Sequence, residues 1–219
     1  MRDPTNKRPP ITTPGAPTFL WVLIGLMAAI ELPLTLSDAG WIGSDGWRIN
    51  VFLYGAFWPP LLNGGFDPLY PVQKALMFLT HALLHGSFVH LAMNSVVLLA
   101  LGKSVAAVIG AGKTILLLAL SAISGAAAFG LLSTSSGPMI GASGAVFGLL
   151  GLWQAWDYRR RRHLGLSIQP VMSGIAGLIL VNLVLFFALS GALAWEAHLG
   201  GWIVGWMAAW TFASQRETK

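Results

Sequence analysis

Long apolar stretches separated by short polar connectors dominate the pattern of the chain. No Asp, Glu, Lys or Arg occurs between Lys74 and Lys103, between Lys113 and Asp157, or between Arg162 and Glu196. A helix that spans a bilayer needs about 20 mostly apolar residues, so each of these gaps is long enough for one or two spans. The pattern therefore predicts an all-α membrane protein.

Six apolar stretches have the composition of membrane helices. We expect helices at residues 18–36, 88–109, 114–132, 143–156, 171–189 and 195–214. The fourth has about 14 residues, or ~21 Å at the usual helical rise, which is short for a span. The sequence therefore predicts that the fourth helix begins inside the membrane, below the surface.

The segments outside these helices differ in composition. Residues 1–17 are polar and rich in Pro, which predicts a disordered tail. Residues 38–72 mix Gly, Pro, Asp and Asn with aromatic residues, which suits a long structured loop at the lipid–water interface. The expected organisation is a cytoplasmic tail at 1–17, a six-span domain at 18–214 and a second cytoplasmic tail at 215–219.

Composition and charge place the chain in a membrane with a defined orientation. It is 55% apolar and 10% charged, whereas soluble domains carry roughly 25% charged residues. Of the 13 Lys and Arg residues, only Arg48 and Lys74 fall outside the two tails and the 2–3 and 4–5 connectors. Because Lys and Arg accumulate on the cytoplasmic side, we expect both termini there, and the 1–2, 3–4 and 5–6 loops outside.

The charge and the cysteine count also exclude some classes of function. The net charge of +5 lies in short connectors, so we attribute it to membrane orientation and expect no nucleic-acid partner. The chain has no Cys, which excludes disulfides, thiolate catalysis and Cys-ligated metal sites.

Ser143 is the first candidate for chemistry. It lies in Gly141-Ala142-Ser143-Gly144 at the predicted start of the fourth helix. Small neighbours let a substrate backbone approach, and the free N–H groups of a helix N-terminus can stabilise an oxyanion. Small residues with Ser are also ordinary contacts between membrane helices, so this motif alone leaves a packing role open.

His198 lies early in the sixth helix and is the second candidate. Gly201 and Gly205 follow it at the four-residue spacing of closely packed helices. The fourth helix offers matching glycines at 144, 148 and 151, so the two helices can pack closely. His198 and Ser143 would then lie at similar depth, within reach of the hydrogen bond that activates a hydroxyl nucleophile. A histidine packed against a backbone carbonyl is the competing interpretation.

The sequence favours a Ser–His dyad over a triad. No Asp or Glu lies deep in the membrane near His198, and Glu196, two residues away, points elsewhere on a helix.

Three histidines and one asparagine precede or begin the second helix. His90 and Asn94 share one helix face, and both can donate a hydrogen bond to an anionic oxygen. With the N–H of Ser143 they would form an oxyanion hole. We assign His81 and His85 to structure, holding the outward loop against the second helix.

A metal site is the alternative use of these histidines. The chain has no His-Glu-x-x-His motif, and no Asp or Glu occurs between Asp67 and Asp157. We therefore predict no metal and no cofactor.

Three blocks of this sequence resemble the rhomboid family in order and spacing. They are Thr80-His81-Ala82-Leu83-Leu84-His85 with His90 and Asn94, then Gly141-Ala142-Ser143-Gly144, then Ala197-His198 with Gly201 and Gly205. The resemblance covers roughly residues 75–213. It implies a rhomboid-like bundle of six transmembrane helices, with a long outward loop between helices 1 and 2.

The resemblance also implies an activity and a role for each residue. The protein would be an intramembrane serine endopeptidase that cleaves transmembrane proteins near the outward end of a span. Ser143 would attack the peptide carbonyl, His198 would take its proton, and Asn94, His90 and the Ser143 N–H would hold the oxyanion. Phe147 occupies the position of an aromatic ring that stacks on the base histidine. We expect the protein in the bacterial inner membrane.

One feature departs from the family pattern. Many members carry Trp-Arg in the outward loop shortly before the histidine block, where this chain has Leu76-Met77-Phe78. Its Trp47-Arg48 lies far upstream, so the sequence does not predict how the loop is anchored.

Two other functions compete with the protease. One is a catalytically inactive rhomboid-like protein that binds membrane helices. The other is a small transporter or channel that uses the histidines, although the chain lacks the paired carboxylates of such pathways.

Overall fold

The structure is a computed structural model, and it describes residues 15–212. The predicted tail at 215–219 and all but residues 15–17 of the tail at 1–17 lie outside the described residues. Within that range the chain is helical, and its only β-structure is an isolated bridge between Phe57 and Met139. The predicted all-α class is therefore confirmed.

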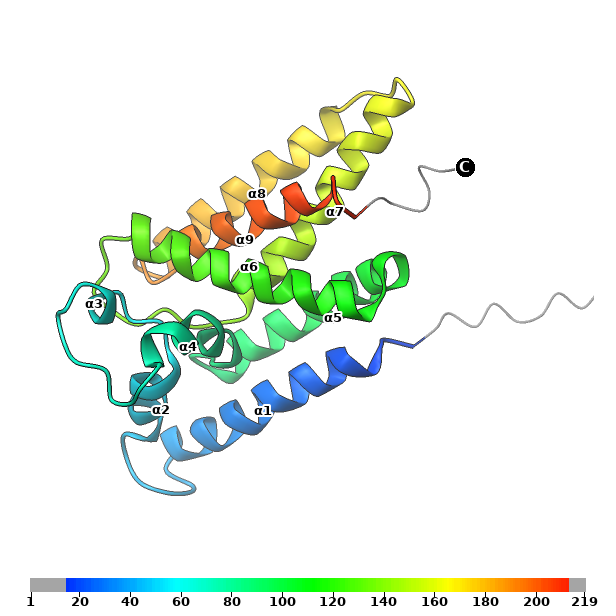
Figure 1. The fold of residues 1–219 in the computed structure, drawn as a ribbon. Coiled ribbons are helices and arrows are strands. Elements are labelled where there is room, and N and C mark those ends of the chain that lie inside the picture. Colours follow the sequence, from blue (N-terminus) through cyan, green and yellow to red (C-terminus); the bar gives the residue numbers. More distant parts are fainter. Residues whose placement is uncertain (1–14, 213–219) are drawn as a thin grey trace, which may run out of the picture.

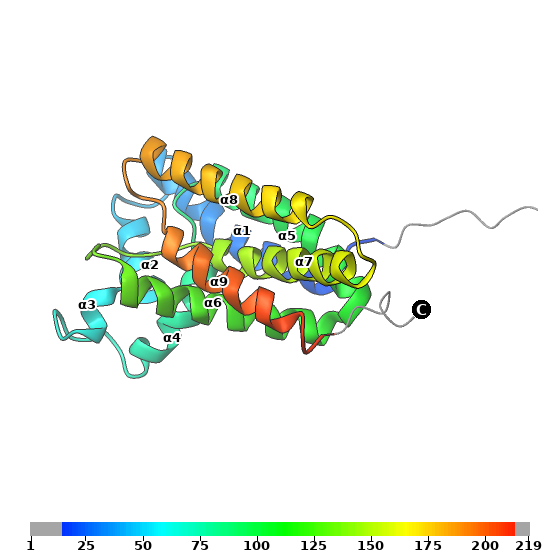
Figure 2. The same cartoon turned by 90° about the horizontal axis from the view of Figure 1, so that it is seen from above.

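The helices form a bundle with a cluster of short helices at one end (Figure 1). In chain order the elements are α1 (Thr18–Asp38), α2 (Trp47–Gly55), α3 (Pro59–Leu62), α4 (Gln73–Thr80), η1 (His81–Leu83), α5 (Phe88–Ile109), α6 (Ala111–Leu132), α7 (Ser143–His163), α8 (Gln169–Ala188) and α9 (Trp195–Ala208). The start of α1 and the end of α9 lie at the end of the bundle opposite α2, α3 and α4, as both views show (Figures 1 and 2).

Four helices, α1, α5, α6 and α8, are long and apolar enough to cross a membrane. Their outward faces are apolar. In α8, for example, Val171 is the one buried residue although the helix is almost wholly hydrophobic. Such a surface is stable in lipid, where a helix satisfies all its own backbone hydrogen bonds. The chain is therefore an integral membrane protein.

The fourth predicted helix is longer than expected. It was predicted to end at Trp156, but α7 runs from Ser143 to His163, 21 residues or about 32 Å. The charged residues at its end continue the helix, since Arg is a good helix former and Arg161 pairs with Asp157 at 2.7 Å, one turn away. The prediction of a short helix is wrong. The length of α7 therefore no longer supports the prediction that this helix begins below the membrane surface.

The bounds of α5 and α6 follow the same rule, whereas α9 ends at Ala208 and not at the predicted residue 214. α6 begins at Ala111, three residues before the predicted start, because Gly110 with φ +83° both ends α5 and precedes α6. Lys113 therefore lies inside the helix. Charged residues mark where compatibility with lipid ends, whereas capping residues mark where the helix ends. α5 has the predicted bounds because Ser87 caps its start.

Arg48 anchors the segment between α1 and α5. Its guanidinium donates two hydrogen bonds of 2.9 Å to Glu31 on α1, one of 2.6 Å to Asp38 and one of 2.8 Å to the carbonyl of His85. The Glu31 side chain is fully buried. Trp47-Arg48, whose role the sequence left open, thus joins α1, α2 and the turn before α5.

Backbone acceptors in α2 hold the rest of this segment. Gln73 donates to the carbonyl of Leu53 at 2.7 Å, and Thr80 donates to the carbonyl of Gly55 at 2.7 Å. The bridge between Phe57 and Met139, with hydrogen bonds of 3.0 and 2.9 Å, ties it to the connector before α7. Much of the predicted loop at 38–72 is therefore ordered, with α2 and α3 inside it.

Glycines allow the backbones of α7 and α9 to touch. A Cβ at Gly201 would overlap the carbonyl of Gly144, and a Cβ at Gly205 would overlap the carbonyl of Gly148. The predicted close packing of the fourth and sixth helices is thus present, and it requires glycine on α9. We call these four residues the glycine seam.

We expect Gly205→Ala to destabilise the protein. The added methyl would overlap the Gly148 carbonyl, and overpacking of this kind typically costs about 1–3 kcal/mol. Thermal unfolding in detergent micelles should show a lower midpoint. Gly177→Ala on α8 is the control, because its Cβ meets nothing within 4 Å. An unchanged midpoint for Gly205→Ala would contradict the seam.

We expect Arg48→Met to destabilise the protein by about 3–5 kcal/mol, because it leaves the buried Glu31 carboxylate unpaired. The double variant Glu31→Leu/Arg48→Met should regain most of the loss, since it removes both charges. Denaturation in micelles measures both, with Lys74→Met as an exposed control. A single variant as stable as the control would show that Arg48 is no anchor.

Candidate active site

A glycine turn delivers Ser143 to the start of α7. Gly141 has φ +117°, and a Cβ there would lie 2.9 Å from two atoms of the His90 ring. Its N–H donates to the carbonyl of His81 at 2.9 Å. Only glycine suits both the backbone conformation and the close approach, so the motif before Ser143 has a structural reason.

Ser143 and His198 form a hydrogen bond across the glycine seam. His198 Nε2 lies 2.8 Å from Ser143 Oγ. The His198 ring stacks on Phe147, with centroids 4.1 Å apart and an interplanar angle of 6°. His198 is buried, so a serine hydroxyl and an imidazole meet away from bulk water. A serine beside a histidine is the arrangement that activates a hydroxyl nucleophile.

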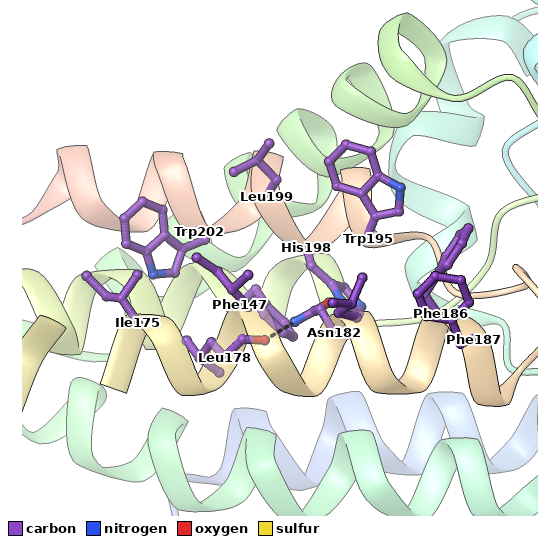
Figure 3. A pocket seen from close by; sticks show the side chains of 12 residues that line it. Phe147, Ile175, Leu178, Asn182, Phe186, Phe187, Trp195, His198, Leu199 and Trp202 are labelled. Atoms are coloured by element: carbon purple, nitrogen blue, oxygen red, sulfur yellow. Dashed lines mark hydrogen bonds between the residues drawn. The ribbon is translucent and has the colours of Figure 1, made fainter. Parts of the chain in front are cut away.

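A third residue, which the sequence analysis missed, contacts the other side of the imidazole. His198 Nδ1 lies 2.6 Å from Asn182 Oδ1 on α8. The Asn182 side chain also donates to the carbonyl of Leu178 at 2.9 Å, which Figure 3 shows as a dashed line. The signal was present in the sequence, because Asn182 is an amide in the apolar middle of α8, and polar groups in lipid are costly.

His90 and Asn94 both lie on α5, as predicted. The ring of His90 and the side-chain amide of Asn94, however, have different neighbours. The His90 ring is next to Gly141, and its Nδ1 accepts from the N–H of Gly86 at 3.5 Å. Cε1 and Nε2 are the ring atoms that face the turn before Ser143. The Asn94 amide is buried and donates to the carbonyl of His90 at 3.1 Å.

His81 and His85 contact different helices. His81 Nε2 lies 3.3 Å from the carbonyl of Ala122 on α6, whereas the His85 ring packs edge-on against His90 at 5.0 Å between centroids. Burial lowers the pKa of both rings to about 4, and for His85 the neighbouring His90 adds to the effect. Both are therefore neutral at neutral pH. Within residues 15–212, no three His, Asp or Glu side chains are placed to hold a metal ion.

A mostly apolar cavity of about 460 Å³ opens between α7, α8 and α9 beside His198 (Figure 3). Phe147, Asn182 and His198 line it together with aliphatic and aromatic side chains of α8 and α9. An extended apolar peptide segment suits such a cavity better than a polar molecule does.

Comparisons with known proteins relate the chain to one family. Residues 73–215 match the profile of the Rhomboid domain. The chain is 34% identical over 197 residues to Rhomboid protease GluP of Bacillus subtilis (strain 168), an alignment that covers 89% of this chain and 35% of that protein. It is 33% identical over 159 residues to Rhomboid protein 1, mitochondrial, of Saccharomyces cerevisiae. That alignment covers 68% of this chain and 45% of the yeast protein. The aligned part is thus less than half the length of either relative.

Proposed function

The chain belongs to the rhomboid family, and from that premise we propose that it is an intramembrane serine endopeptidase. The observation that carries the proposal is the 2.8 Å contact between Ser143 Oγ and His198 Nε2. Retention of both residues also favours a protease over an inactive rhomboid-like protein that only binds membrane helices.

In the proposed reaction Ser143 Oγ attacks a peptide carbonyl while His198 Nε2 accepts the hydroxyl proton. His198 then donates that proton to the leaving amine, and an acyl-enzyme forms. Water, with His198 again as base, hydrolyses the ester and restores Ser143. Phe147 lies flat against the imidazole and supports its orientation during both proton transfers.

The oxyanion of the tetrahedral intermediate would be held by the N–H of Ser143, by His90 and by Asn94. The first-turn N–H groups of α7 lack partners within the helix and are available as donors. His90 is the better placed of the two side chains, because its ring lies at Gly141. The Asn94 NH₂ group gives one of its two hydrogens to the carbonyl of His90, so the second hydrogen would have to serve the oxyanion.

We propose six membrane spans by adding α7 and α9 to the four helices that are long and apolar enough. α7 carries charges in its last turns, and α9 has 14 residues. An even number of spans fits the position of both described chain ends at one end of the bundle (Figure 1). The distribution of Lys and Arg indicates that this end of the bundle is cytoplasmic. The membrane would be the bacterial inner membrane, and the six-span domain would comprise residues 18–214.

The substrate would be a span of another membrane protein, cut near its outward end. A helix hides its carbonyls in hydrogen bonds, so the segment must unwind before Ser143 can attack. The cut should follow a small residue, and the chemistry needs no metal or cofactor. Entry between α5 and α8 is supported by the weak burial of α8, whose one buried residue is Val171.

We expect Ser143→Ala and His198→Ala each to abolish cleavage of a membrane-spanning substrate reconstituted in liposomes. The nucleophile and base act as one unit, so losing either removes most of the rate. Cleavage is read as the appearance of two fragments over time.

Matched controls are Ser104→Ala and His163→Ala, since both residues are exposed and distant from the dyad in sequence. More than a few per cent of wild-type turnover in either dyad variant would refute the assignment. Substrate binding without cleavage by the wild type would instead favour the inactive relative.

A further inference from the structure

We infer that Asn182 is a positioning residue that holds His198 in the tautomer and ring orientation of a general base. The inference rests on the proposed protease function. It begins from the 2.6 Å contact between Asn182 Oδ1 and His198 Nδ1, on the side of the imidazole opposite Ser143.

The donor and acceptor pattern leaves one consistent assignment. The Asn182 NH₂ group donates to the carbonyl of Leu178 at 2.9 Å, so its oxygen faces His198. An amide oxygen only accepts hydrogen bonds, and therefore His198 Nδ1 carries the hydrogen. A neutral imidazole has one N–H, so Nε2 has a free lone pair and accepts the Ser143 proton. The bond at Nδ1 remains when His198 becomes the imidazolium.

Asn182 and Phe147 restrain different motions of the same ring. The stack with Phe147, at an interplanar angle of 6°, limits tilting of the imidazole but not rotation within its plane. The hydrogen bond from Nδ1 limits that rotation and excludes the opposite tautomer. Asn182 thus orients the base, a role for which the sequence offers no Asp or Glu near His198.

The position of Asn182 supports a functional reason for its presence. It lies within α8, whose single buried residue is Val171, so an amide there adds little to packing. A polar side chain in an apolar membrane helix is unfavourable unless it is satisfied. Both ends of this amide are satisfied, one by its own helix and one by the base.

The test compares steady-state cleavage by full-length Asn182→Leu and Asn182→Asp in liposomes. Asn182→Leu removes the acceptor and keeps the branching at Cγ. We expect kcat to fall by about 10- to 100-fold, the range found when a residue that orients a metal-bound histidine is lost, with KM little changed. Asn182→Asp keeps the acceptor and should retain more activity. Its carboxylate favours the imidazolium, so the acidic limb of its kcat/KM profile should move to higher pH.

Val181→Leu is the matched control, because Val181 is the exposed neighbour on the same helix, and it should match the wild type. The positioning role would be overturned if Asn182→Leu kept the wild-type kcat and pH profile. It would also be overturned if Asn182→Leu raised KM and left kcat unchanged. So would a pH profile of Asn182→Asp that matches the wild type. If Ser143→Ala or His198→Ala still cleaves, the proposed function itself fails, which is a separate outcome.

Discussion

The contact between the backbones of α7 and α9 is the constraint on which the site depends. Carbonyls of Gly144 and Gly148 occupy the space where side chains at Gly201 and Gly205 would lie. Ser143 begins α7, and His198 lies in the first turn of α9, so the seam brings their side chains within 2.8 Å. In lipid no hydrophobic force drives helices together, so close packing of this kind contributes to the association together with interhelical hydrogen bonds.

A second chain of contacts leads from the short helices to the same place. Arg48 holds the carbonyl of His85, the His85 ring packs against His90, and the His90 ring lies against Gly141. Gly141 in turn precedes Ser143 by two residues. The segment between α1 and α5 is thereby linked to the turn that presents Ser143. The Arg48–Glu31 pair therefore bears on the site as well as on stability.

The sequence predicted much of this because motif and spacing are local properties. The start of α5 at Phe88 and the glycines of the seam follow from residues a few positions apart. The matching glycine spacings of the two helices then predicted that Ser143 and His198, 55 residues apart, lie close together. The anchor at Arg48 could not be predicted, since no motif in the sequence links Arg48 to its partners 17 and 37 residues away, which it meets only in the fold. The end of α7 lies beyond the predicted one because its charged last turns remain helical outside the apolar stretch. Asn182 was missed because its neighbours form no motif.

The central claim is that Ser143 is a nucleophile activated by His198. The most direct measurement is labelling of the wild-type protein in micelles by a fluorophosphonate, with the modified residue identified by mass spectrometry. We predict modification at Ser143 in the wild type and its near-complete loss in His198→Ala, because the hydroxyl without its base is a weak nucleophile. Absence of label from Ser143 in the folded wild type, or labelling of His198→Ala at the wild-type rate, would contradict the account.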